Sequence, residues 1–318
     1  MTRILVTGGA GYIGSIATHM LLEAGYEVSV LDDLSTGHKN AIDTRARFVE
    51  GSILDSDALT AALSNCSAVM HFAGKSLVGE SVEKPDLYMQ VNVEGSTKLL
   101  DAMKVAGIKD IVFSSSAATY GQPGDAPISE QSPTKPTNPY GVTKLKVDEL
   151  LASRAASDGI AAVSLRYFNV AGALQTSDGW LAERHNPETH LIPNIFKATP
   201  SAPLQVFGTD WPTPDNTCIR DYVHVLDLID AHISALSILK PGTHQVLNLG
   251  SGSGYSVREV IDTASRVAGR VMPSVDVARR AGDPAVLVAS IEKAKKVLNW
   301  SPKRDLNQIM QDVVSSGA

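Results

Sequence analysis

Cysteine is scarce in this chain of 318 residues, which holds only Cys66 and Cys218, far apart in the sequence. Because neither belongs to a CxxC pair, the sequence predicts neither a disulfide framework nor a structural zinc site. The eight histidines are scattered, and none forms HExxH or a similar spacing of metal ligands. From the sequence we therefore expect no metal ion.

Long hydrophobic runs and dense positive charge are also missing. No apolar run approaches the roughly 18 to 20 residues that a membrane-spanning helix needs. A net charge of −6 and a pI near 5.7, without a Lys/Arg stripe, argue against a nucleic-acid-binding surface. Because "MTR" leads directly into "ILVTGG", we expect no signal peptide and a cytoplasmic location. We expect neither nucleic acid nor a membrane as a partner.

Short Val/Ile/Phe-rich runs alternate with helix-like stretches over the first half of the chain. The runs are "RILVTGG", "EVSVLDD", "ARFVEGS", "AVMHFAG", "DIVFSSS" and "AAVSLRYFN", and the stretches include 13–23 and 56–63. Gly25, Gly107 and Gly159 each fall where a left-handed residue would end a helix. The pattern predicts βαβ units and a parallel sheet covered on both faces. After about Asn169 the composition predicts a smaller, loop-rich second domain.

Gly8, Gly11 and Gly14 form GxxGxxG between the first expected strand and the first expected helix. Bare backbone there lets a pyrophosphate approach the free N–H groups of the helix N-terminus. Asp32 ends the next strand, where a carboxylate can bind the adenosine ribose 2′-hydroxyl and would repel a 2′-phosphate. The sequence therefore predicts NAD rather than NADP, although a tight turn and a loop cap would explain the same residues without a cofactor.

"NPYGVTKLKVDEL" predicts a helix with Asn138 as N-cap and Pro139 at its first position. Tyr140 and Lys144 then lie one turn apart on the same face. A phenol with an ordinary pKa of about 10 can act as a base near neutral pH only if a positive charge favours the phenolate, and Lys144 can supply that charge. A solvated helix face with Lys144 paired to Asp148 is the simpler interpretation of the same spacing.

With "TGGAGYIG", "HFAG", "FSSSAATYG" and "YGVTK" in this order, the chain resembles the extended short-chain dehydrogenase/reductase family. "HFAGKSLVGESVEKP", "LRYFNVAGA", "RDYVHVLDL", "NLGSG" and "RRAGDPA" narrow the resemblance to its UDP-glucose/UDP-galactose 4-epimerases, from residue 2 to about Trp300. The resemblance implies a Rossmann-type doubly wound parallel sheet with a smaller, discontinuous α/β substrate domain. It also implies bound NAD, a UDP-sugar substrate and a homodimer. We expect an NAD-binding domain at 1–168, joined by about 221–250, and a nucleotide-sugar-binding domain at 169–220 and 251–318.

The resemblance assigns a role to each matching position. Tyr140 is the expected acid/base, Lys144 lowers its pKa and binds the nicotinamide ribose, and Ser116 binds the reacting sugar hydroxyl. The expected cofactor contacts are Gly8, Gly11, Tyr12, Ile13, Gly14, Asp32, Asp33, Ser52, Ile53, Phe72, Ala73, Gly74, Asn92, Lys144 and Phe168. The expected substrate contacts are Ser116, Tyr140, Asn169, Leu191, Phe207, Arg220, Arg280, Asp283 and Leu287. Oxidation at sugar C4 would give a 4-keto intermediate, which takes the hydride back on its other face.

Two positions depart from the family pattern, both on the cofactor side. Ser52 stands where the family often has an aspartate that contacts adenine, and the lysine that usually follows "FAG" by two places appears one place early, as Lys75 before Ser76. Leu287, four residues after Asp283, is expected to line the sugar pocket, and packing in a strand core is the alternative. Its intermediate size predicts a preference for UDP-glucose and UDP-galactose over the N-acetylated pair.

Other members of the family remain as alternatives at this stage. A 4,6-dehydratase would carry an Asp-Glu pair where this chain has Ala117 and Ala118, so dehydration is disfavoured. An epimerase of UDP-glucuronate or UDP-N-acetylhexosamine and a nucleotide-sugar reductase stay open. A non-catalytic NAD-sensing or scaffold protein would usually have lost part of the Ser/Tyr/Lys set, whereas this chain has all three members.

Overall fold

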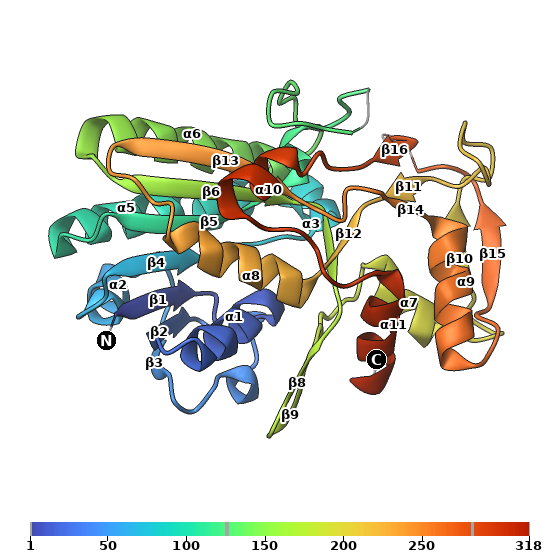
Figure 1. Cartoon of the computed structure of the whole chain (residues 1–318), viewed down its shortest axis with the longest axis horizontal. Coiled ribbons are helices and arrows are strands. Elements are labelled where there is room, and N and C mark those ends of the chain that lie inside the picture. The colour runs from blue at the N-terminus through green and yellow to red at the C-terminus, as the bar shows by residue number, and fades with distance from the viewer. Residues whose placement is uncertain (1, 125–126, 281–282, 318) are drawn as a thin grey trace. The chain divides into compact units, whose positions relative to one another are not determined.

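The largest sheet of the computed structural model has seven strands, and the structure describes residues 2–124, 127–280 and 283–317 (Figure 1). Its strands are β1 (Arg3–Thr7), β2 (Glu27–Asp32), β3 (Arg47–Glu50), β4 (Ala68–His71), β5 (Asp110–Ser116), β6 (Ala161–Tyr167) and β13 (Thr243–Leu249). They are ordered β13-β6-β5-β4-β1-β2-β3, and the pairs β1/β2, β2/β3, β1/β4 and β4/β5 are parallel. The predicted Rossmann-type α/β fold is confirmed.

Helices connect these strands much as the sequence predicts. They are α1 (Tyr12–Glu23), α2 (Ser56–Leu63), α3 (Val78–Glu83), α4 (Pro85–Tyr88), α5 (Gly95–Ala106) and α6 (Pro139–Asp158), with the short turns η1 (Lys39–Ala41), η2 (Met89–Glu94) and η3 (Ala117–Thr119). Asp55 caps α2 by accepting from the N–H groups of Asp57 and Ala58, which explains where this helix begins. Gly107 and Gly159 end α5 and α6 with φ values of 72° and 70°, the left-handed conformation that glycine adopts most readily.

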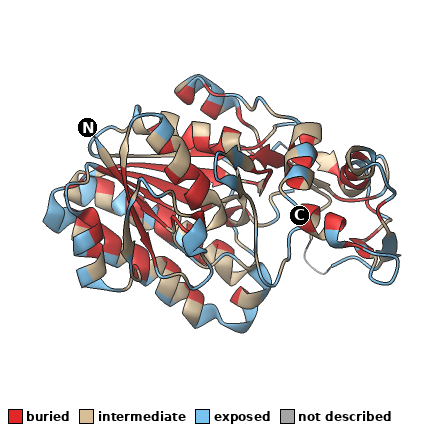
Figure 2. Ribbon diagram, turned by 90° about the horizontal axis from the view of Figure 1, so that it is seen from below, coloured by how far each residue is buried: buried red, intermediate tan, exposed pale blue. Residues whose placement is uncertain are grey.

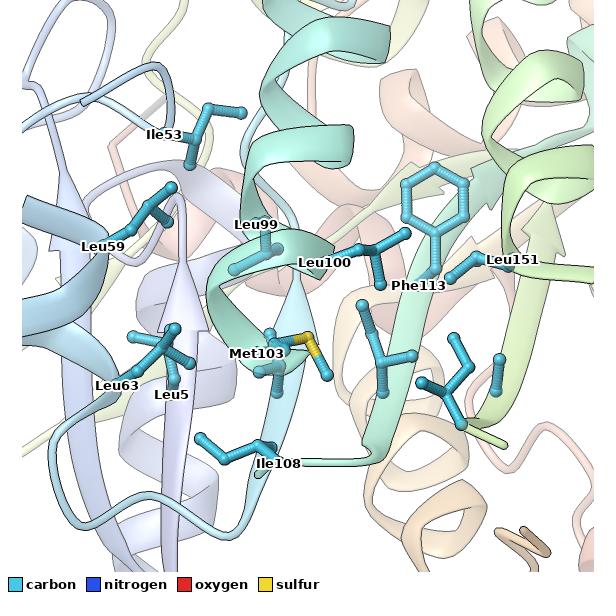
Figure 3. Packing of buried hydrophobic residues seen from close by; sticks show 14 of the residues in the cluster. Leu5, Ile53, Leu59, Leu63, Leu99, Leu100, Met103, Ile108, Phe113 and Leu151 are labelled. Carbon is cyan, nitrogen blue, oxygen red and sulfur yellow. The ribbon is translucent and has the colours of Figure 1, made fainter. Parts of the chain in front are cut away.

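The core on one face of the sheet packs α2, α5 and α6 against the strands. Figure 3 shows Leu99, Leu100 and Met103 of α5 among Leu5 and other buried apolar side chains of this cluster. On the same strands, the residues adjacent to those of this cluster are buried too, namely Ile4, Val6, Val30, Met70 and Val112. Since neighbouring strand residues point to opposite faces, both faces of the sheet are covered (Figure 2).

The strand order reverses at β1, which separates β2 from β4. Thr7 pairs with Leu31 on one side and with His71 on the other, so the carboxyl ends of β1, β2 and β4 lie side by side. In open α/β sheets, ligands bind beyond the carboxyl ends of the strands at such a reversal. The fold therefore identifies this edge as the place for a cofactor.

Contacts divide the chain into two compact units. The first is Met1–Gly121, Thr134–Arg166 and Ile229–Leu247, and the second is Gln122–Pro133, Tyr167–Leu228 and Asn248–Ala318. Helix α8 (Val225–Leu236) contains the boundary between Leu228 and Ile229. The domain limits that the sequence predicts remain a prediction, and the second unit has an additional piece, 122–133, that they do not include.

The second unit is built from short strands and a few helices. Its strands are β7 (Asn169–Ala171), β8 (Leu174–Thr176), β9 (Gly179–Leu181), β10 (Leu204–Phe207), β11 (Ile219–Arg220), β12 (Tyr222–His224), β14 (Tyr255–Ser256), β15 (Ser274–Val277) and β16 (Val286–Leu287). Its helices are α7 (Leu191–Lys197), α9 (Val257–Ala268), α10 (Glu292–Leu298) and α11 (Leu306–Ser315), and the core of the unit packs α7, α9 and α11 together. Among the described helices, none is long and apolar enough to cross a membrane.

Candidate active site

Ser116, Tyr140 and Lys144 come together in the first unit. Asn138 caps α6 by accepting from the Gly141 N–H at 2.8 Å, with Pro139 at the first helical position as the sequence predicts. Ser116 is the last residue of β5, and its hydroxyl lies near enough to Tyr140 to lower the pKa of that phenol. The Lys144 ammonium lies 5.8 Å from the centroid of the Tyr140 ring. A strand end and one helical turn thus place a hydroxyl, a phenol and an ammonium in one group.

The electrostatics of this group are set by burial. Burial raises the pKa of Tyr140, while the neighbouring Ser116 hydroxyl acts in the opposite direction. Burial also lowers the pKa of Lys144 to about 8, although Asp148 acts against that shift. Without further positive charge, Tyr140 is therefore held in its neutral form at neutral pH. A cationic ring bound beside the phenol would favour the phenolate.

Lys144 is held by contacts with strand β5 and not by Asp148, which lies one turn further along the same helix. Its Nζ donates to the Ser114 carbonyl oxygen at 2.7 Å and lies 4.8 Å from the centroid of the Phe113 ring. Asp148 instead accepts from Ser115 Oγ at 3.1 Å and from Arg166 Nε at 2.9 Å. The Lys144–Asp148 pair that a solvated helix face would have is therefore not the arrangement found.

The Asp148–Arg166 pair is a feature that inspection of the sequence did not find. The two side chains are 4% and 7% exposed, and Arg166 also stacks with its guanidinium carbon 4.9 Å from the centroid of the Tyr120 ring. Because the pair joins α6 to β6, it holds the helix that carries Tyr140 and Lys144 against the sheet. Neither the spacing nor the types of these residues in the sequence predicts that Arg166 pairs with Asp148.

The glycine loop forms a close-packed cradle between β1 and α1. A Cβ on Gly14 would lie 2.1 Å from the Gly8 carbonyl oxygen, and Gly8 itself has a φ of 73°. Gly11 is the N-cap of α1, so the N–H groups of Tyr12 and Ile13 belong to the open first turn. The first turn contains no acidic residue. This cradle fits a pyrophosphate, because the backbone can approach closely and the helix dipole favours negative charge.

Asp32 lies beside this cradle and is 9% exposed. One oxygen accepts from the Ala10 N–H at 2.9 Å and the other accepts from the Leu34 N–H at 2.8 Å. Burial raises its pKa, and these two backbone hydrogen bonds act in the opposite direction. The carboxylate is thus fixed in orientation, at the position expected for a ribose hydroxyl. Asp33 is exposed and accepts from the Ser35 N–H at 2.9 Å.

Asn92, an expected cofactor contact, also forms hydrogen bonds that join two segments of the first unit. Its Nδ2 donates to the Lys75 carbonyl oxygen and to Thr143 Oγ1, both at 3.0 Å, and its Oδ1 accepts from the Lys75 N–H at 2.7 Å. These bonds join the loop after β4 to α6. No local pattern in the sequence predicts this hydrogen bond, because Asn92 and Thr143 are 51 residues apart.

The other expected cofactor contacts follow strand ends. Phe72, Ala73 and Gly74 directly follow β4, and the Ala73 N–H donates to Thr7 Oγ1 at 3.3 Å. After β3, Ser52 Oγ accepts from the Leu54 N–H at 3.2 Å, whereas Ile53 is buried in the core. Any contact from Ile53 would therefore come from its backbone. Phe168 belongs to the second unit and is 9% exposed.

In the second unit, two groups of the expected substrate residues come together. Arg220 Nη1 donates to the Pro284 carbonyl oxygen at 2.9 Å, and Arg220 Nη2 lies 3.7 Å from Asp283 Oδ1. Leu287 pairs with Arg220 between strands β16 and β11 and is half-buried. Separately, the Arg280 guanidinium stacks 3.8 Å from the centroid of the Phe207 ring.

Two further expected substrate residues belong to other elements of this unit. Asn169 Nδ2 donates to the Asp221 carbonyl oxygen at 3.0 Å. Leu191 begins α7 and packs against the core of the unit. Within the "RRAGDPA" motif, Ala281 and Gly282 lie outside the described residues.

Comparison with known proteins shows which family this chain resembles. A model of the NAD dependent epimerase/dehydratase family matches residues 4–250. The UDP-glucose 4-epimerase of Corynebacterium glutamicum is 49% identical over 313 residues, covering 98% of this chain and 94% of that protein. The crystal structure of the Brucella ovis UDP-glucose 4-epimerase in complex with NAD matches with a TM-score of 0.93 and 43% identity, over 98% of this chain and 97% of that one.

A second solved structure matches over nearly the same length. The UDP-glucose 4-epimerase from Bifidobacterium longum in complex with NAD+ and UDP has a TM-score of 0.91 and 36% identity, covering 99% of this chain and 97% of that chain. The family model spans well over half of the chain, and the relatives match it from end to end. The chain therefore belongs to the NAD-dependent epimerase/dehydratase family.

Proposed function

We infer that this protein interconverts UDP-glucose and UDP-galactose as a UDP-glucose 4-epimerase with bound NAD. The observation that carries the inference is Tyr140 with Ser116 and Lys144 beside it, in a chain 49% identical to a UDP-glucose 4-epimerase over almost its whole length. Isomerisation at one sugar carbon needs a group that moves a proton and a cofactor that holds a hydride between two half-reactions.

We propose that Tyr140 moves the proton of the sugar C4 hydroxyl, with Ser116 binding that hydroxyl. NAD bound beside these residues would supply the hydride acceptor and donor for sugar C4, so that a 4-keto sugar could regain hydride on its other face. Lys144 keeps positive charge close to the phenol and is available to a ribose hydroxyl. Because burial alone raises the pKa of Tyr140, deprotonation depends on this positive charge and on the cationic ring of the oxidised cofactor.

Different residues are assigned to different parts of the dinucleotide. We propose that the cradle of Gly8, Gly11 and Gly14 holds the pyrophosphate and that Asp32 binds the adenosine ribose. Tyr12, Ile13 and the residues after β4 complete this surface. Support comes from the close approach of the glycines and from the fixed orientation of the Asp32 carboxylate. A 2′-phosphate would meet that carboxylate, so NAD is preferred to NADP.

The second unit supplies the proposed recognition of UDP. Arg220 and Arg280 are assigned to the diphosphate and uracil, because a guanidinium stays charged and can bind phosphate with two parallel hydrogen bonds. Asn169, Leu191 and Phe207 are assigned to the same nucleotide, and Asp283 to the uridine ribose. Arg220 lies 3.7 Å from Asp283, which supports the proposal that these two residues bind neighbouring parts of the same nucleotide.

A homodimer and a cytoplasmic location are also proposed. Both rest on the resemblance to the epimerases, and the dimer is expected to form through two helices from each subunit. Sedimentation velocity analysis of the purified protein would measure the mass of the assembly in solution.

The activity is tested by adding UDP-galactose and coupling the formation of UDP-glucose to its oxidation by a second enzyme. We expect turnover with no net release of NADH before the coupling enzyme is added. Deuterium at C4 of the substrate should stay in the product, because the hydride leaves and returns within one complex. Stoichiometric NADH accumulation with UDP-glucose would indicate a dehydrogenase, and loss of the C4 deuterium to solvent would contradict the hydride route.

A further inference from the structure

A segment of the second unit between β9 and α7 gathers four potential metal ligands. In "ERHNPETH", Glu183 and His185 are followed five residues later by Glu188 and His190. One ligand atom from each of the four lies within 4.8 Å of all the others. None of these residues belongs to the set proposed for epimerisation.

The two carboxylates of this cluster are deeply buried. The side chains of Glu183 and Glu188 are 8% and 5% exposed, while those of His185 and His190 are 29% and 46% exposed. Two carboxylates buried so close together repel each other and lose hydration, so they require positive charge between them.

The ion pairs within the cluster converge on the same few atoms. His190 Nδ1 lies 2.6 Å from Glu183 Oε1 and 3.3 Å from Glu188 Oε1. His185 Nδ1 lies 2.8 Å from that same Glu183 oxygen, and the two imidazole ring centroids are 5.4 Å apart. Such convergence of nitrogen and oxygen atoms from a single loop is what a small cation requires.

Two buried atoms of the cluster have no hydrogen-bond partner. Glu188 Oε1 accepts from the N–H groups of Thr189 and His190 at 2.8 and 2.9 Å, but its Oε2 is buried without a partner. His185 Nδ1 is also buried without a hydrogen-bond partner, although it lies 2.8 Å from Glu183 Oε1. An unpartnered oxygen on a side chain that is only 5% exposed is costly, and a cation bound to it would remove that cost.

We propose that Glu183, His185, Glu188 and His190 bind one zinc ion. Two imidazole nitrogens and two carboxylate oxygens suit zinc, whereas calcium and magnesium prefer oxygen ligands alone. Zinc–ligand bonds of about 2.0 to 2.2 Å in tetrahedral geometry place the ligand atoms roughly 3.4 Å apart. The histidine nitrogens 2.6 and 2.8 Å from Glu183 Oε1 would move slightly away from that oxygen, and the pairs separated by up to 4.8 Å would move closer together. Because the protein fills all four positions, the site is structural.

Zinc at this position would fix the beginning of α7. His190 is the N-cap residue of that helix, and Leu191, a proposed substrate contact, follows it directly. The proposal departs from the absence of metal expected from the sequence. The ligand spacing does not match HExxH, and only the folding of the loop brings the two Glu-x-His pairs together.

The test uses the full-length protein after its metals have been removed with a chelator. Zinc chloride is titrated while isothermal calorimetry follows binding, and zinc is counted by elemental analysis after gel filtration. We expect one zinc ion per chain and a higher melting temperature with zinc than with magnesium. The double variant His185→Gln/Glu188→Gln should bind zinc more weakly by roughly 100-fold or more. Glu292→Gln, which removes an exposed carboxylate of α10, should bind it as the unmodified protein does.

Equal zinc binding by the double variant, or no zinc bound by the folded unmodified protein, would overturn the proposal. If the double variant does not fold, cobalt(II) in the unmodified protein provides the second measurement. Tetrahedral nitrogen and oxygen coordination gives intense visible absorption bands, which zinc should abolish by displacement. Weak octahedral bands alone would rule out the four-ligand site.

Discussion

Lys144 Nζ donates a 2.7 Å hydrogen bond to the Ser114 carbonyl oxygen, two residues before Ser116 on the same strand. The ammonium is therefore fixed relative to the strand that carries the proposed substrate-binding hydroxyl, and its distance to Tyr140 is set by one turn of α6. Removing Lys144 consequently changes the charge next to Tyr140 without removing the phenol itself.

Tyr140→Phe should fold and retain NAD but reduce kcat by roughly 100-fold or more, because only the group that moves the proton is removed. Turnover in the coupled assay measures kcat, and the absorbance of the purified protein measures bound NAD. Near-normal turnover by a variant that retains NAD would reject Tyr140 as the base.

Lys144→Met should make the NAD-free protein more stable at pH 7, by at most about 3 kcal/mol, and should reduce the activity of the NAD-bound protein. Burial lowers the pKa of Lys144 from 10.5 to about 8, so between these values the unfolded chain binds more protons than the folded one. The free energy of unfolding should therefore rise with pH from 8 to 10.5 because of Lys144, and this contribution should vanish in the variant.

Denaturant unfolding at pH 7, 8 and 10.5 measures this slope. Lys146→Met is the matched control, because Lys146 is an exposed lysine on the same helix and its removal should leave the slope unchanged. If the free energy of unfolding changes with pH equally in Lys144→Met and in the unmodified protein, burial does not lower the pKa of Lys144.

Asp148→Asn should destabilise the protein by about 3 to 5 kcal/mol, because it leaves the guanidinium of Arg166 buried without its carboxylate. Chemical denaturation gives the difference in the free energy of unfolding. Glu149→Gln, which changes the adjacent exposed carboxylate, should have an effect within about 0.5 kcal/mol. A similarly small effect from Asp148→Asn would mean that the buried pair does not hold α6.

Leu287→Ser should raise activity on UDP-N-acetylgalactosamine relative to UDP-galactose by roughly 10- to 200-fold, since relieving a clash of this size is worth about 1 to 3 kcal/mol. The ratio of the two kcat/KM values measures the effect. Val286→Ser is the control, because neighbouring strand residues point to opposite faces. An unchanged ratio together with a lower melting temperature would place Leu287 in the core instead of the sugar pocket.

Features that depend on a few neighbouring residues could be predicted from the sequence. Helix α2 has the expected bounds, α1 begins one residue before its expected start, and Asn138 caps α6 as proposed. Caps, left-handed glycines and the alternation of strands and helices act within a few residues, so their physical causes are visible in the sequence. The order of motifs then identified the family, because each motif keeps its place on this alternating framework.

Pairings between distant residues were decided by the tertiary structure alone. Asp148 has Arg166 as its partner instead of Lys144, and Asn92 joins Lys75 to Thr143. Many acidic and basic residues could have paired, and only the packing of α6 against the sheet selects among them. The sequence by itself determined the α/β framework and the proposed Ser/Tyr/Lys group. Tertiary packing determined which buried charges neutralise each other, because that depends on distances that no local spacing specifies.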